Sequence, residues 1–145
     1  MRFAVFKEEN HEIKAIYDCP DESFAKLQCE EGEAYLELDQ SVWNEGLIYI
    51  DEVNGTPRVE YKNEMSLEFN KLNANADGED KIIFNNIPSG SRIIVQEGRE
   101  PAVFDCICDD GTILLTFESE GTYRLDISHP KYLIFTTQLE IKTWS

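Results

Sequence analysis

The sequence predicts a mainly β protein in two parts: a small N-terminal β-rich unit with one short helix, and a C-terminal antiparallel β-sandwich. Two patterns lead to this prediction. Short runs of apolar and β-branched residues recur along the chain, and turn residues separate them. After Met65 about seven such runs follow one another with turn signals roughly every 8 to 12 residues, which is the spacing of a sandwich.

The first elements are expected to be a hairpin and a helix. FAVF (3–6) and EIKAIY (12–17) flank a polar turn and predict two paired strands. Pro20 and the acids at the front of DESFAKLQ (21–28) predict a helix of about two turns, with proline at its first position and apolar residues three apart. We expect this to be the only helix in the chain.

A strand and a second hairpin complete the N-terminal unit. EAYLEL (33–38) alternates strictly, so it predicts a half-buried strand with Tyr35 on its polar face. Asn54-Gly55 lies between LIYIDEV (47–53) and PRVEY (57–61), and this dipeptide favours a tight hairpin because both residues tolerate positive φ. A short polar stretch then predicts a boundary, with domains at 1–64 and 65–145.

The second domain is predicted to contain strands joined by Gly- and Pro-containing turns. A polar loop is expected at 73–80, between the first two strands. Tyr123 follows the Glu120-Gly121 corner as in a tyrosine corner, which favours an immunoglobulin-like (Ig-like) antiparallel β-sandwich. The expected strands are 66–72, 81–87, 92–96, 102–108, 113–117, 123–127 and 132–142.

Charge limits the classes of partner. The 145 residues carry 29 acidic and 13 basic side chains, for a net charge of −16. Nucleic-acid binding requires clustered Lys and Arg, which the sequence lacks, so neither nucleic acid nor an anionic membrane is expected as a partner. The N-terminal apolar run is too short for a signal-peptide core, and synthesis in a cytosol is expected.

Reactive side chains form no coherent constellation in the sequence. Cys106 and Cys108 are predicted to share one face of a strand as half-buried apolar residues. His11 and His129 lie at expected turns, so neither is predicted to be a catalytic base. We therefore expect no enzyme activity, no catalytic residues and no cofactor.

Acidic loops offer a weak case for a metal site. Asp77, Glu79 and Asp80, or Asp109 and Asp110, supply oxygen atoms of the kind that bind Ca²⁺. Solvated loop acids are the favoured interpretation, and no metal site is predicted.

Three aromatic residues are the candidates for an interface: Tyr35, Trp43 and Tyr49. Tyrosine and tryptophan are enriched in protein–protein contacts. Exposed aromatic residues also bind carbohydrate, so a sugar site remains an alternative interpretation, with candidates Tyr35, Trp43, Tyr49, Tyr61 and Tyr132.

The order of several motifs resembles that of structural proteins of tailed phages and prophages that carry a C-terminal bacterial Ig-like domain. The first segment of the resemblance is Asp18-Cys19-Pro20, Leu27-Gln28, Glu31-Gly32-Glu33-Ala34, Tyr49-Ile50-Asp51, Asn54-Gly55 and Arg58-Val59-Glu60. The second is Asn75-Ala76-Asp77-Gly78, Ile87-Pro88-Ser89-Gly90, Asp110-Gly111, Leu115-Thr116-Phe117, Glu120-Gly121-Thr122-Tyr123 and His129-Pro130-Lys131-Tyr132-Leu133. The Cys106-Ile107-Cys108 run and the acidic composition depart from the pattern.

The resemblance implies a non-enzymatic virion component, tail-associated, at a tail tip or fibre adapter. Its partners would be other virion proteins, in a symmetric multi-copy assembly, and it would be made in the bacterial host cytoplasm. Two alternatives stay open: a carbohydrate- or cell-surface-binding module of a tail fibre, and a capsid decoration protein.

Overall fold

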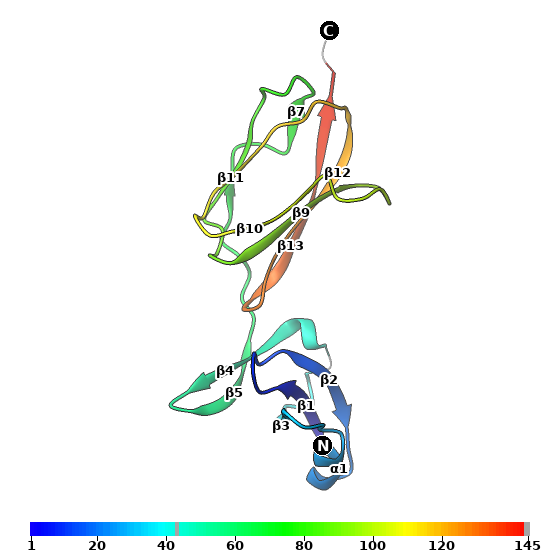
Figure 1. Cartoon of the computed structure of the whole chain (residues 1–145), viewed down its shortest axis with the longest axis vertical. Helices are drawn as coiled ribbons and strands as arrows, with labels where there is room; N and C mark the ends of the chain where they lie inside the picture. The colour runs from blue at the N-terminus through cyan, green and yellow to red at the C-terminus, as the bar shows by residue number, and fades with distance from the viewer. Residues whose placement is uncertain (43, 144–145) are drawn as a thin grey trace. The chain divides into compact units, whose positions relative to one another are not determined.

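The computed structural model describes residues 1–42 and 44–143 and confirms a mainly β protein with one short α-helix and several antiparallel sheets. The chain divides into two compact units, Met1–Asn63 (unit 1) and Glu64–Ser145 (unit 2), one residue before the boundary expected from the sequence. Figure 1 shows the path of the chain through each unit.

Unit 1 is built on a three-stranded antiparallel sheet with β1 at its centre, in the order β2-β1-β3. The expected pairing of the first two strands is confirmed, and β3 pairs with the other edge of β1. The elements of unit 1 are β1 (Arg2–Lys7), β2 (Ile13–Asp18), α1 (Glu22–Leu27), β3 (Glu33–Leu38), the 3-10 helix η1 (Glu45–Leu47), β4 (Ile48–Val53) and β5 (Thr56–Tyr61).

The central strand β1 is buried on both faces, which explains its continuous apolar run. Alternate side chains of a strand point to opposite faces. Ala4 belongs to a cluster with Leu38, Val42 and Ile48, whereas Phe3 belongs to a second cluster with Cys19 and Ala25 of α1. The N-terminal strand therefore completes its own sheet.

The helix differs from the prediction at its start and in its buried face. The N-cap is Asp21, so the helix begins at Glu22 and Pro20 lies before it. The Asp21 carboxylate accepts a hydrogen bond from the Ser23 N–H at 3.0 Å. Ala25 is fully buried, because only a small side chain fits against the sheet, while Phe24 and Leu27 are 46% and 77% exposed. The prediction of one short α-helix is confirmed for the described residues, and η1 adds a single 3-10 turn.

The second hairpin forms as predicted. β4 and β5 pair in register from Ile48↔Tyr61 to Val53↔Thr56. Asn54 and Gly55 have φ of +53° and +80°, and two successive positive values match the right-handed twist of the strands they join.

Unit 2 is a sandwich of a five-stranded sheet, β10-β9-β12-β13-β7, and a three-stranded sheet, β11-β8-β6. Consecutive strands β12 and β13 form a long hairpin, and β11 and β12 lie in different sheets, as in Ig-like folds. The strands are β6 (Glu68–Phe69), β7 (Asn73–Asn75), β8 (Ile82–Asn85), β9 (Ser91–Glu97), β10 (Phe104–Cys108), β11 (Ile113–Leu115), β12 (Gly121–His129) and β13 (Tyr132–Lys142).

Two predictions at the start of unit 2 are wrong. The strand expected at 66–72 is reduced to the two residues of β6, and the polar loop expected at 73–80 begins with a strand, β7. β7 pairs in parallel with β13, from Asn73↔Glu140 to Asn75↔Lys142. The polar strand β7 is stable because β13 provides its backbone hydrogen-bond partners. The local sequence of β7 alone does not indicate a strand.

The corner before β12 is confirmed as a tyrosine corner. The Tyr123 hydroxyl donates a hydrogen bond to the Ser119 backbone carbonyl at 3.0 Å. At Gly121, with φ +158°, a Cβ would meet the Glu97 carboxylate, so the end of that flexible side chain would have to move. Tyr123, Leu125 and Ile127 all point into the core and are at most 5% exposed, which confirms the alternation read in the sequence.

Replacing Tyr123 with phenylalanine tests this corner. The Tyr123→Phe change removes one intramolecular hydrogen bond and keeps the buried ring, so we expect unit 2 to lose about 1 kcal/mol of unfolding free energy. Chemical denaturation followed by circular dichroism measures the loss. Tyr61→Phe is the control, because Tyr61 is 58% exposed and its change is expected to stay within about 0.5 kcal/mol. Equal stability of wild type and Tyr123→Phe would contradict this role of the hydroxyl.

Candidate functional site

One concavity among the described residues lies at a lateral opening of the sandwich in unit 2. It has a volume of about 360 Å³. Val103 and Phe104 border it from the start of β10, and residues 115–119, at the end of β11 and in the following connection, border it from the other sheet. We call this concavity the hollow. It exists because β10 and β11 are both terminal strands, so no further strand closes the gap between them.

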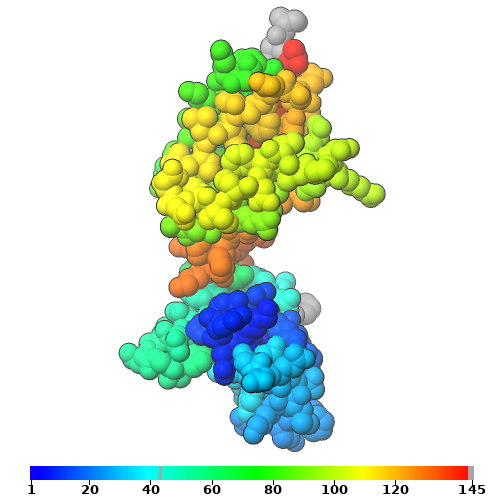
Figure 2. Space-filling model, viewed as in Figure 1, coloured from blue at the N-terminus to red at the C-terminus, as the bar shows by residue number. Residues whose placement is uncertain are grey.

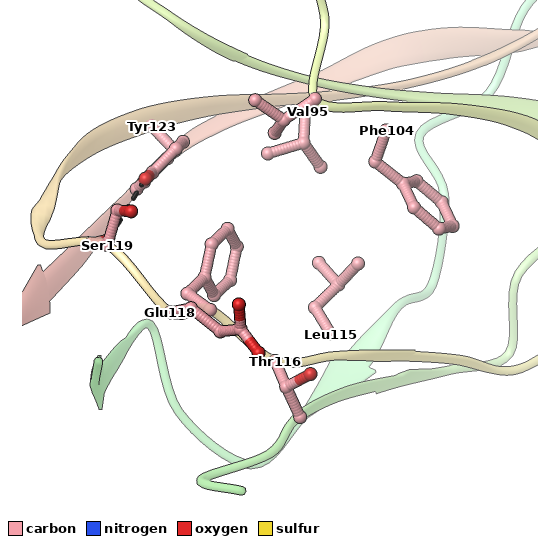
Figure 3. A pocket seen from close by; sticks show the side chains of 9 residues that line it. Val95, Phe104, Leu115, Thr116, Glu118, Ser119 and Tyr123 are labelled. Carbon is pink, nitrogen blue, oxygen red and sulfur yellow. Dashed lines mark hydrogen bonds between the residues drawn. The ribbon is translucent and has the colours of Figure 1, made fainter. Parts of the chain in front are cut away.

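Most of the side chains around the hollow are apolar. Val95, Leu115 and Tyr123 are at most 5% exposed, and they form its inner wall together with Phe117. Figure 3 shows the side chains of Val95, Phe104, Leu115 and Tyr123 around the open space. The Phe117 and Tyr123 rings pack with their centroids 4.7 Å apart. Such a surface binds through apolar contact and shape.

The polar side chains that line the hollow are those of Thr116, Glu118, Ser119 and Tyr123. Glu118 is the one charged side chain that lines it, and Thr116 and Ser119 add hydroxyls. Burial raises the pKa of Tyr123, and the nearby Glu97 charge adds to this, so the phenol stays protonated at neutral pH. The side chains that line the hollow therefore bring together no nucleophile with a base.

Acidic side chains dominate the connections that border the hollow. The two connections that reach the hollow, those after β9 and β11, carry one basic residue, Arg99. Their exposed acidic residues are Glu100, Glu118 and Glu120. Like charges at this density attract cationic partners and repel anionic ones.

Tyr35, the leading interface residue from the sequence, has partners within its own unit. Its ring packs edge-on against Phe3 with centroids 5.9 Å apart, and its hydroxyl donates to the Glu22 carboxylate at 2.9 Å. That hydrogen bond is the main cause of its raised pKa, and burial adds to it. The face predicted to be polar and solvated is therefore the floor of a small cluster beneath α1.

Tyr49, the second interface candidate, lies in a different sheet from Tyr35. Tyr49 lies half-buried on β4, opposite Glu60 of β5. Trp43 lies outside the described residues. The large apolar side chains that unit 1 exposes near Tyr35 belong instead to α1, where Phe24 and Leu27 point outward.

The cysteines behave as the sequence predicts. Cys106 and Cys108 share the inner face of β10 and pack against the core of unit 2. All four thiols are free, and burial raises the pKa of Cys29, Cys106 and Cys108, which keeps these three protonated and weakly nucleophilic.

The histidines and loop acids form local structure. The His129 ring bridges the Ser89 carbonyl at 3.0 Å and the Lys131 N–H at 3.1 Å. Asp77 accepts the N–H groups of Glu79 and Asp80, while Asp80 pairs with Lys71 and accepts the Asn75 N–H. Within residues 1–42 and 44–143, no cluster of three or more His, Cys, Asp or Glu side chains is arranged to hold a metal ion.

Sequence reasoning missed the hollow. Its apolar residues, from Val103 to Phe104 and from Leu115 to Phe117, were assigned to predicted strands without any sign that two of those strands end their sheets. The local sequence of β10, Phe-Asp-Cys-Ile-Cys, carries no signal that marks it as a terminal strand.

The fold and the hollow together define a class, a β-sandwich module with an apolar lateral opening and an acidic border. In comparisons with known proteins, no family model, curated protein or solved structure matches the chain. In the part of the chain that the structure describes, no helix has the length and apolar character needed to cross a membrane.

Proposed function

We propose that this chain is a non-enzymatic structural protein that works by docking other proteins, and that it is a tail-associated component of a phage virion. The observation that carries the docking role is the apolar hollow between two terminal strands, because open sheet edges with apolar neighbours are sites where proteins add a partner's segment. The virion setting rests on the sequence resemblance, namely the order of the turn motifs in both units.

The geometry at the hollow favours docking over chemistry. An apolar wall with one exposed carboxylate supplies contact area and charge selection, and it supplies no acid–base pair. In a symmetric multi-copy particle each copy would present the same hollow to an equivalent neighbour. The chain would be made in the host cytoplasm and incorporated during assembly.

The composition of purified particles tests this function. We expect the protein in particles from its producing strain, at a fixed copy number relative to tail proteins, measured by quantitative mass spectrometry. Absence from intact particles would contradict the proposal. Specific binding of the isolated protein to a glycan array, with no fixed copy number in tails, would favour the carbohydrate-binding alternative instead.

A further inference from the structure

β10 is the longest free edge of the sandwich. The terminal strands of the two sheets are β6, β7, β10 and β11, with two, three, five and three residues. Short edge strands offer few unpaired backbone groups, so three of these edges are poor templates for another strand. β10 pairs only with β9, and alternate N–H and C=O groups of an edge strand point away from its partner.

β10 also lacks the usual protection of an edge. Natural edges carry lysine, proline or inward-pointing charge that prevents pairing. The five residues of β10 are Phe-Asp-Cys-Ile-Cys, and the only charged side chain, Asp105, is held by Arg92 of β9 through hydrogen bonds of 2.8 and 3.0 Å. Figure 2 shows the 100–115 stretch as a yellow band on the surface of unit 2.

We propose that β10 and the hollow bind an extended, cationic segment of a partner protein, which adds to the five-stranded sheet as a further strand. This inference deepens the proposed function and rests on it. Side chains of an added strand alternate between two faces. One set would enter the hollow against Val95, Leu115 and Phe117, and the other would face solvent near the acidic connections.

Charge determines the chemistry of the occupant. The two connections that border the hollow carry three exposed acidic residues and one basic residue, and the whole chain has a net charge of −16. A segment that alternates apolar residues with Lys or Arg is complementary to this border. A second copy of this chain would bring the same acidic border against it, so self-pairing through β10 is disfavoured.

Synthetic peptides test the inference on the full chain. The probe is a seven-residue peptide of alternating valine and lysine. The two comparison peptides replace lysine with glutamate, or the central residue with proline, which cannot complete the ladder. We expect the valine–lysine peptide alone to shift the amide NMR signals of 103–108 and to slow their hydrogen exchange, with weaker binding at high salt.

A matched pair of charge reversals locates the site. Glu118→Lys alters the border of the hollow, whereas Glu68→Lys makes the same charge change on exposed β6, at the far edge of the other sheet. Reversing a nearby exposed charge is expected to weaken binding of the valine–lysine peptide roughly threefold to tenfold in Glu118→Lys, and to leave it nearly unchanged in Glu68→Lys.

Three outcomes would overturn the inference. The first is that millimolar valine–lysine peptide leaves the NMR signals of residues 95–119 unchanged, and the second is that the glutamate peptide binds equally well. The third is that hydrogen exchange of β10 slows as the concentration of the protein itself is raised, which would make a second copy the occupant. Failure here, with the protein still present at fixed copy number in particles, would reject this docking site and leave the proposed function standing. Absence from particles would reject the function itself.

Discussion

Phe84→Ala is expected to cost unit 2 about 3–5 kcal/mol of unfolding free energy. Phe84 on β8 is fully buried, and its ring lies against Phe69 and Phe135, with centroids 5.3 and 6.2 Å away. It fills the space between the two sheets, so truncation loses apolar burial and leaves a cavity. A unit of this length is stable by roughly 4–12 kcal/mol, so the loss is a large share of its total.

Denaturant unfolding with residue-resolved amide NMR measures this effect and assigns it to a unit. We expect signals of Glu64–Thr143 to disappear at lower denaturant in Phe84→Ala. Phe69→Ala is the matched control, because Phe69 is also a phenylalanine but is 45% exposed. Its truncation is expected to cost roughly 1 kcal/mol of unfolding free energy. Equal losses in the two variants would show that Phe84 is not the centre of this core.

Phe3→Ala is expected to unfold most molecules of unit 1. Phe3 is 2% exposed and holds α1 to the sheet through Cys19, Ala25 and Tyr35. The truncation costs about 3–5 kcal/mol. Unit 1 has 63 residues and two small core clusters, so its total free energy of unfolding is roughly 3–9 kcal/mol. Small units are also less stable because they bury a smaller fraction of their surface.

Hydrogen exchange followed by mass spectrometry measures the unfolding of unit 1. Fast exchange throughout Met1–Val42 is the expected result for Phe3→Ala. Phe24→Ala removes the same ring from an exposed position on α1 and is expected to stay within about 1 kcal/mol of wild type. Native-like exchange in Phe3→Ala would contradict the two-faced burial of β1.

Local chemistry made much of the fold predictable. Asn54-Gly55 specified its hairpin because positive φ is a property of those residues. Tyr123 specified its corner because its hydroxyl reaches a carbonyl four residues upstream. The strand β13 was predicted with its observed bounds, because one long apolar and β-branched run follows the His129-Pro130 turn.

Long-range pairing made the rest unpredictable. β7 is a strand because it lies beside β13, more than sixty residues away, and its own Asn-Ala-Asn sequence favours a loop. The outward turn of Phe24 and Leu27 follows from how closely α1 approaches the sheet at Ala25. Likewise, the hollow depends on which strands end each sheet, and strand order is set by the whole topology.

The surroundings of Tyr35, the leading interface candidate, also depend on contacts that its local sequence does not show. Tyr35 was selected because it alternates with two glutamates, yet α1 covers that face and makes its ring part of a cluster. A Tyr35→Ala variant would therefore disturb unit 1 itself, and loss of assembly would not identify an interface. Glu118 is the better probe of docking, because it is exposed and borders the hollow.

Hydrogen exchange of this protein within purified particles, compared with the free protein, tests the docking role most directly. We predict slower exchange on assembly at residues 103–108 of β10 and at 115–119 across the hollow, with unchanged exchange in the core strand β12. If the amide hydrogens of the free and the assembled protein exchanged at identical rates along the whole chain, a role in docking other proteins would be contradicted.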